Sequence, residues 1–230
     1  MKKYKHLIFD LDNTLLDFND TEEQALRNVF KTFNVPETAE SFDTYKSINK
    51  DLWSSLEKGT IAREDIFNTR FALFFKQYNL DIDGIKAEKL YRGFLNDGCK
   101  TIKNAEVLLS KLKKRNYQIY AGTNGMGITQ RKRLMDSGLL NYFDDLFISE
   151  EIGYEKPDPR FFDTLFDSLH ITDKASCLMI GDSLSSDILG AQNVEIDSVL
   201  YDTEQILSSS AATYTINDLL QIYSLLEEEK

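Results

Sequence analysis

Short apolar runs that end abruptly at a polar residue or a glycine recur along this chain. Five of them are rich in β-prone side chains and lack alternation between polar and apolar positions; they cover residues 6–9, 118–121, 146–148, 177–180 and 198–201. Continuous apolarity is typical of strands that are buried on both faces, as in a parallel sheet. The pattern therefore predicts five buried strands.

Helical patterns separate most of these runs. Residues 158–169 place several large apolar side chains on one face, and residues 105–115 and 131–137 show shorter stripes, the last with Leu134 and Met135 on the same side. Regular alternation of strand and helix favours right-handed crossovers and a doubly wound α/β sheet. We therefore expect a parallel sheet with helices on both faces.

The stretch between the first and second runs has a different character. Residues 17–98 contain no comparable β-rich run. Their amphipathic patterns predict helices near residues 20–33, 41–57, 64–78 and 84–95. Most aromatic side chains of these patterns are expected to fill the core of a small helical bundle. The alternative is that one or two of them, with Trp53 and Phe42 as candidates, face outward over a substrate. The sequence thus predicts an α/β core domain, residues 1–16 and 99–230, that is interrupted by a helical domain at 17–98.

The charge balance limits the partners of such a protein. The chain has 230 residues with 27 Lys and Arg against 38 Asp and Glu, a net charge of −11, so it should repel nucleic-acid polymers and anionic membrane surfaces. No run approaches the roughly 20 apolar residues of a membrane span. Because Asp10 and Asp12 interrupt the apolar stretch near the N-terminus, that stretch does not fit a signal peptide. We expect a cytoplasmic protein, and its oligomeric state is left open.

The scarcity of two residue types narrows the chemistry. The sequence has only two Cys and two His, too few for a disulfide framework or for a zinc site built from these residues. A nucleophile activated by His would have to use one of those two side chains. We therefore expect any catalysis to depend on carboxylates.

Acidic residues follow two of the predicted strands, where ligands of open α/β sheets bind. Asp10 and Asp12 are two residues apart in near-extended chain and so point the same way; one could be a nucleophile and the other a general acid and base. Asp182 follows a glycine after the fourth run, and with Asp10 it offers the oxygen ligands that suit Mg²⁺. Asp187 could face the same ion or could only complement a helix dipole.

Two other segments offer groups that hold an anion. Residues 122–125, Gly-Thr-Asn-Gly, precede a helical pattern, so the Thr123 hydroxyl and nearby backbone N–H groups could bind phosphate there. Lys156 lies in a loop that two prolines stiffen, and by pattern it is the cation nearest to the carboxylates. A carboxylate nucleophile, a neighbouring acid, Mg²⁺ and an anion site together predict phosphoryl transfer through an aspartyl-phosphate.

The same residues resemble the motifs of the haloacid dehalogenase (HAD) superfamily. Residues 10–14, Asp-Leu-Asp-Asn-Thr, match its first motif, Thr123 the second, Lys156 the third and residues 181–187 the fourth, in the family's order within residues 1–190. The helical insert resembles the family's cap domain. The overall order, the turn at Thr123 and the aromatic cap look most like the pyrimidine 5′-nucleotidases of the family.

The resemblance implies a role for each of these residues. Asp10 would attack the phosphate, and Asp12 would protonate the leaving group and then activate water. Because dehalogenases of the family lack an acid at the position of Asp12, the chain resembles the phosphatases. The groups that hold Mg²⁺ would be Asp10, Asp182 and the backbone carbonyl of Asp12, with Asp187 supporting the metal's water shell or orienting Lys156. The groups that bind the phosphate would be Thr123, the backbone amide of Asn124 and Lys156.

The function that the resemblance implies is Mg²⁺-dependent hydrolysis of a small phosphorylated metabolite, with nucleoside 5′-monophosphates as the expected substrates. A phosphatase for sugar phosphates or phosphoglycolate is the nearest alternative. A signalling module that keeps its phosphate on Asp and a non-catalytic binding protein are alternatives of other classes. The helical insert disfavours the first of these, and the intact set of polar residues disfavours the second.

Overall fold

A parallel sheet organises the larger part of the chain. The computed structural model describes residues 3–203 and 211–228, and within these ranges the sheet has six strands in the order β3-β2-β1-β4-β5-β6, each neighbouring pair parallel. The strands are β1 (His6–Phe9), β2 (Gln118–Thr123), β3 (Asp145–Ile148), β4 (Cys177–Gly181), β5 (Asp197–Tyr201) and β6 (Tyr214–Ile216). The doubly wound parallel sheet and the five predicted strands are confirmed. The sequence does not predict β6, a strand of three residues in which only Ile216 is buried.

Helices follow most of these strands and cover the sheet. The longer ones are α5 (Ala105–Lys114), α6 (Gly127–Asp136), α8 (Pro159–Ser168) and α10 (Gln221–Glu228). The shorter ones are α7 (Ser149–Ile152), α9 (Leu189–Asn193), the 3₁₀ turns η1 (Leu140–Tyr142) and η2 (Lys174–Ser176), and the π-helical turn η3 (Leu184–Ile188), which continues into α9.

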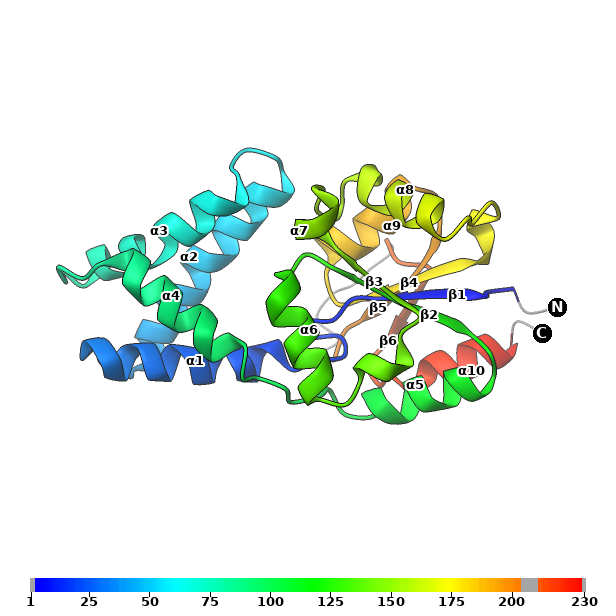
Figure 1. Ribbon diagram of the computed structural model, residues 1–230, viewed down its shortest axis with the longest axis horizontal. Helices are drawn as coiled ribbons and strands as arrows, with labels where there is room; N and C mark the ends of the chain where they lie inside the picture. The colour runs from blue at the N-terminus through cyan, green and yellow to red at the C-terminus, as the bar shows by residue number, and fades with distance from the viewer. Residues whose placement is uncertain (1–2, 204–210, 229–230) are drawn as a thin grey trace. The chain divides into compact units, whose positions relative to one another are not determined.

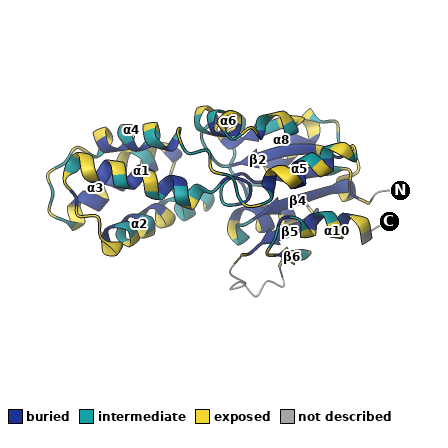
Figure 2. Cartoon of the chain, turned by 90° about the horizontal axis from the view of Figure 1, so that it is seen from below, coloured by how far each residue is buried: buried dark blue, intermediate teal, exposed yellow. Residues whose placement is uncertain are grey.

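The sheet is buried on both faces. In β1, Leu7 and Phe9 lie in one apolar core together with side chains of α5 and α10, whereas Ile8 lies in a second core with side chains of α8 and α9. The two helical layers stand on opposite sides of the sheet (Figure 1), and the strands between them are dark blue, the colour of buried residues (Figure 2). Successive side chains of a strand point to opposite faces, so a strand covered on both faces requires the continuous apolar runs of the sequence.

One helix face differs from the sequence prediction. Leu134 of α6 is buried, but Met135 is 61% exposed and does not share its face. The other buried positions of α6 are Gly127, Gln130 and Arg133. Two large polar side chains of this helix therefore point inward.

The direction of winding reverses between β1 and β4. The strand β1 pairs with β2 on one side and with β4 on the other, and the carboxyl ends of strands at such a switch point are the usual ligand position of α/β sheets. The register sets Phe9 opposite Ile180, and the backbone N–H of Asp10 donates to the carbonyl of Ile180 at 2.8 Å. The two acidic strand ends are therefore neighbours in space.

Residues 18–98 form a helical unit of their own. The chain divides into two compact units, Met1–Asp17 with Cys99–Lys230, and Phe18–Gly98. The helices of the second unit are α1 (Phe18–Phe33), α2 (Ala39–Glu57), α3 (Arg63–Gln77) and α4 (Gly84–Leu95). Its core is mainly aromatic and also encloses an ion pair, in which Arg70 donates two hydrogen bonds to Glu88 at 2.7 and 2.8 Å. Among the described residues, no helix combines the length and the apolarity that crossing a membrane requires.

Candidate active site

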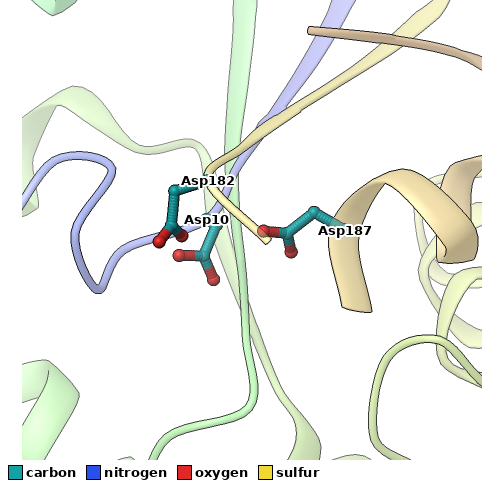
Figure 3. A group of neighbouring side chains, drawn as sticks. All are labelled: Asp10, Asp182 and Asp187. Atoms are coloured by element: carbon teal, nitrogen blue, oxygen red, sulfur yellow. The ribbon is translucent and has the colours of Figure 1, made fainter. Parts of the chain in front are cut away.

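Three carboxylates converge at the switch point of the sheet. Asp10 is the first residue after β1, Asp182 is the first after β4, and Asp187 lies in η3. Each contributes an oxygen to a group in which these atoms lie within 4.8 Å of one another, and Figure 3 shows the three side chains pointing toward a common centre. The sequence-predicted residues Asp10, Asp182 and Asp187 are thus brought together by two parallel strands and the helical turn that follows one of them.

A glycine at the end of β4 makes room for Asp187. A Cβ atom on Gly181 would lie 2.1 Å from Oδ2 of Asp187, which is far inside van der Waals contact. Ser183 is the N-cap of η3, and its side chain accepts a hydrogen bond from the N–H of Ser186 at 3.2 Å. The backbone N–H of Ser183 in turn donates to Oδ2 of Asp187 at 3.1 Å. The turn after β4 therefore both caps its helix and aims a carboxylate back at the strand end.

Lys156 joins this group through all three of its N–H donors. Its Nζ lies 2.7 Å from Oδ1 of Asp10, 2.7 Å from Oδ1 of Asp187 and 2.5 Å from the carbonyl oxygen of Gly122. An ammonium group has three donors, so these contacts satisfy it. Lys156 is almost completely buried. In this arrangement the lysine holds the carboxylate of Asp10 in place.

The three carboxylates outnumber the lysine, and the pKa values of two of them, Asp10 and Asp182, are raised. Burial raises the pKa of Asp10 well above its ordinary value; Lys156 opposes the shift, and Asp187, Asp182 and Asp12 add to it. Burial and the neighbouring Asp187 raise the pKa of Asp182 to about 7. Burial alone would lower the pKa of Lys156, but Asp10 and Asp187 raise it instead. The site is therefore short of positive charge.

This donor set fits a hard divalent cation. Carboxylate oxygens are the ligands that Mg²⁺ prefers, usually one or two of them together with water molecules. An ion placed among Asp10, Asp182 and Asp187 would supply the positive charge that Lys156 alone does not provide. The chemistry and the burial of these residues thus suit a divalent cation, and the metal ligands expected from the sequence stay a prediction.

The Thr123 hydroxyl lies at the end of β2 and is buried. Its Oγ1 accepts hydrogen bonds from the backbone N–H of Gly125 at 3.1 Å and from Nε2 of Gln130 at 2.9 Å. A hydroxyl has two acceptor lone pairs and one donor hydrogen. With both lone pairs engaged, the hydrogen is left to donate to a further group, such as the oxygen of an anion.

The carboxylate of Asp12 is held apart from the other three. Nη1 of Arg133 donates to its Oδ1, and Nε2 of Gln130 donates to its Oδ2 at 2.8 Å. Sequence reasoning missed both of these α6 residues. The signal that could have found them is their spacing, because residues three apart on a helix share a face and here that face also carries Leu134.

Two further polar side chains support the site. The side chain of Asn124 donates to the backbone carbonyl of Lys156 at 2.9 Å and accepts from its N–H at 2.8 Å, so it fixes the loop that carries the lysine. The Thr14 hydroxyl, which the sequence analysis did not assign, donates to Oδ1 of Asp182 at 3.4 Å. The side chain of Asn124 therefore has a structural task, and the expected anion contact involves its backbone amide alone.

Comparison with known proteins finds a family model and a solved structure that this chain matches over most of its length. Residues 7–201 match the family model described as haloacid dehalogenase-like hydrolase. The HAD-hydrolase YfnB of Bacillus subtilis is 38% identical over 231 residues, covering 100% of this chain and 98% of that protein. Its magnesium-bound crystal structure superposes with a TM-score of 0.93, covering 98% of this chain and 100% of that one.

Two other relatives have names that include an activity. The pyrimidine 5′-nucleotidase PynA of Streptococcus pneumoniae is 37% identical over 222 residues, covering 94% of this chain and 94% of that protein. The pyrimidine 5′-nucleotidase YjjG of Escherichia coli is 31% identical over 229 residues, covering 97% of this chain and 98% of that protein. The similarity extends over nearly the whole of each protein.

Proposed function

The chain belongs to the haloacid dehalogenase-like hydrolase family, and from this premise we propose that it is a Mg²⁺-dependent phosphomonoester hydrolase that works through an aspartyl-phosphate on Asp10. The observation that carries the proposal is the position of Asp10. It is buried at the switch point of the sheet, held by Lys156 at 2.7 Å and flanked by two further carboxylates. Such a carboxylate is oriented for attack and is shielded from bulk water.

In the first step, an oxygen of Asp10 attacks the phosphorus of the substrate. The bond from phosphorus to the ester oxygen breaks, and Asp12 in its protonated form gives its proton to that oxygen, so an alcohol leaves. Thr123, the backbone amide of Asn124 and Lys156 hold the non-bridging phosphate oxygens in this proposal, which preserves the roles predicted from the sequence. Because all three donors of Lys156 are engaged by protein groups, binding the phosphate requires it to exchange one of them.

In the second step, Asp12, now ionised, takes a proton from a water molecule whose oxygen attacks the phosphorus. The bond from phosphorus to Asp10 breaks, inorganic phosphate leaves, and both carboxyl groups return to their starting states. The net reaction consumes one ester and one water, and it yields one alcohol and one phosphate.

We assign the metal site to the side chains of Asp10 and Asp182 and the backbone carbonyl of Asp12. When bound, Mg²⁺ would neutralise the phosphate oxygens as charge develops on them. The magnesium bound in the YfnB structure supports magnesium as the metal. Asp187 accepts hydrogen bonds from Lys156 and Ser183, so we assign it to orienting the lysine.

For the substrate we propose nucleoside 5′-monophosphates, pyrimidine nucleotides in particular. The support is the similarity to two pyrimidine 5′-nucleotidases over nearly the full chain. A panel of nucleotides, sugar phosphates and phosphoglycolate, assayed for released phosphate with and without Mg²⁺, tests this. Turnover of sugar phosphates without turnover of any nucleotide would refute the substrate class, and equal turnover without divalent cations would refute the metal requirement.

The nucleophile is tested by Asp10→Asn, because an amide cannot form the acyl phosphate. We expect this variant to fold and to lose turnover on every substrate of the panel. Asp163→Asn is the matched control, since Asp163 is exposed and pairs loosely with Lys174 at 3.4 Å; it should retain full activity. Near-normal activity of Asp10→Asn would exclude the mechanism.

A further inference from the structure

We propose that Gln130 and Arg133 are positioning residues that fix the carboxylate of Asp12 for proton transfer. The inference rests on the proposed function, in which Asp12 is the general acid and base. Neither residue belongs to the motifs that the sequence analysis identified. Both lie on α6, more than one hundred residues along the chain from Asp12, at separations of 118 and 121.

The two side chains hold both oxygens of one carboxylate. Arg133 donates through Nη1 to Oδ1 of Asp12, and Gln130 donates through Nε2 to Oδ2 at 2.8 Å. The donors also bind each other, because Nη1 of Arg133 lies 2.9 Å from Oε1 of Gln130. Since the amide oxygen accepts from the guanidinium group, the amide nitrogen must face the carboxylate. The network therefore sets both the position and the plane of the Asp12 carboxyl group.

The two α6 side chains of this network are buried, whereas the carboxylate that they hold is partly exposed. Gln130 and Arg133 are each 1% exposed, whereas the side chain of Asp12 is 28% exposed. Buried arginine is rare unless it is paired, and here its partners are Asp12 and Gln130. A carboxylate has about four lone-pair sites, so an oxygen that accepts one hydrogen bond from α6 can still exchange a proton with a substrate or water.

Gln130 also links Asp12 to the proposed phosphate site. Its Nε2 donates to Oγ1 of Thr123 at 2.9 Å as well as to Asp12. The backbone makes room for this amide, because a Cβ atom on Gly125 would lie 2.5 Å from Nε2 of Gln130. The amide of Gln130 thus binds both Asp12, the proposed proton donor, and the Thr123 hydroxyl, which is proposed to bind the phosphate. The amide thereby holds the Asp12 carboxylate and the Thr123 hydroxyl at a set separation.

A positioning role predicts a loss that depends on the leaving group. General acid–base catalysis typically contributes about 10²–10⁴-fold, and misplacing the acid should lose part of this, roughly 10–100-fold. An alkyl alcohol needs the proton to leave, whereas p-nitrophenolate is stable without it. The ratio kcat/KM covers the steps up to departure of the alcohol, so the difference should appear there. The later attack of water is common to both esters and affects kcat alike.

The experiment compares Arg133→Met and Gln130→Met with the wild type on p-nitrophenyl phosphate and on an alkyl phosphomonoester that the wild type hydrolyses. We expect kcat/KM to fall about 10–100-fold for the alkyl ester and less than about threefold for the aryl ester. Arg131→Met is the matched control, because Arg131 lies on the exposed face of the same helix and pairs with exposed Glu151 at 2.8 Å. It should leave both values unchanged.

A second comparison uses the acid itself. In an Asp12→Asn background, Arg133→Met should cause no additional loss on the alkyl ester, because the group that it positions is already gone. If Arg133→Met does not fold by circular dichroism, Gln130→Met, a substitution of similar length, decides the question alone.

Different results would refute the proposed function and the positioning role. A wild-type protein that hydrolyses neither p-nitrophenyl phosphate nor any alkyl phosphomonoester of the substrate panel would refute the proposed function. The positioning role would be refuted by the following combination in an active protein. The Asp12→Asn variant loses more kcat/KM on the alkyl ester than on the aryl ester, whereas the variants of Gln130 and Arg133 lose kcat/KM equally on both esters or on neither.

Discussion

Removing the charge of Lys156 should destabilise the sheet unit severely, and Lys156→Met does this while nearly keeping the length of the side chain. The ammonium group lies 2.7 Å from Asp10 and 2.7 Å from Asp187. Both carboxylates are buried. The substitution therefore leaves two acidic groups close together in a place with little access to water.

The magnitude follows from the cost of an uncompensated buried charge. Breaking a buried ion pair by removing one partner costs about 3–5 kcal/mol. Two carboxylates are stranded here, but burial already raises the pKa of Asp10 well above its ordinary value, so proton uptake by Asp10 keeps the loss in that range. For a unit of this size about 1 kcal/mol corresponds to roughly 2–4 °C in Tm, which gives a fall of roughly 6–20 °C.

The sign of the pH dependence is also fixed. A carboxyl group whose folded-state pKa is raised favours the folded state most below its unfolded pKa, and this contribution disappears as the pH rises through the folded value. Loss of Lys156 removes the interaction that opposes the upward shift of Asp10. We therefore expect the destabilisation to be larger at pH 8 than at pH 5.5.

Calorimetry without divalent cations measures this effect. Tryptophan fluorescence is unsuitable, because the single Trp of the chain, Trp53, lies in the helical unit. Lys174→Met is the matched control, since its pair with Asp163 is exposed and should contribute less than about 1 kcal/mol. Adding Asp187→Asn to Lys156→Met should recover stability. A loss below about 1 kcal/mol at pH 8, or no recovery in the double variant, would refute the reasoning.

Two further predictions concern the same carboxylates. Gly181→Ala should reduce kcat at least tenfold in a folded protein, because the new Cβ would lie 2.1 Å from Oδ2 of Asp187. Gly93→Ala is the control and should not change kcat, because its Cβ meets nothing within 4 Å. Equal activity of both variants would contradict the role of Gly181. Mg²⁺ affinity should rise with pH through the region of pH 7, because the pKa of Asp182 is raised to about 7, the pKa of Asp10 is raised well above its ordinary value, and the ion competes with their protons. Isothermal calorimetry from pH 5.5 to 8 checks this, and a constant Kd would be inconsistent with it.

The elements that the sequence predicts well are those whose signal is local. Continuous apolar runs identify β1 to β5, and the parallel order then places Asp10 beside the end of β4, where Asp182 stands. The strand β6 has one partly buried, one exposed and one buried residue, so it lacks the continuous apolar run that identifies the other strands. Met135 is exposed because the buried face of α6 contains Gln130 and Arg133 instead. Those side chains are buried by partners distant in the sequence, which no local apolar pattern can show.

The net charge of −11 raises the question of how this chain would bind an anion. Lys156 does not answer it alone, because Asp10, Asp187 and a backbone carbonyl engage its three donors. Arg133 is engaged as well, by Asp12 and Gln130. Burial and neighbouring carboxylates raise the pKa values of Asp10 and Asp182, so the site disfavours further negative charge. A phosphate would therefore meet repulsion unless a divalent cation first binds these carboxylates. We accordingly expect metal binding to precede productive substrate binding, so that KM as well as kcat depends on the Mg²⁺ concentration.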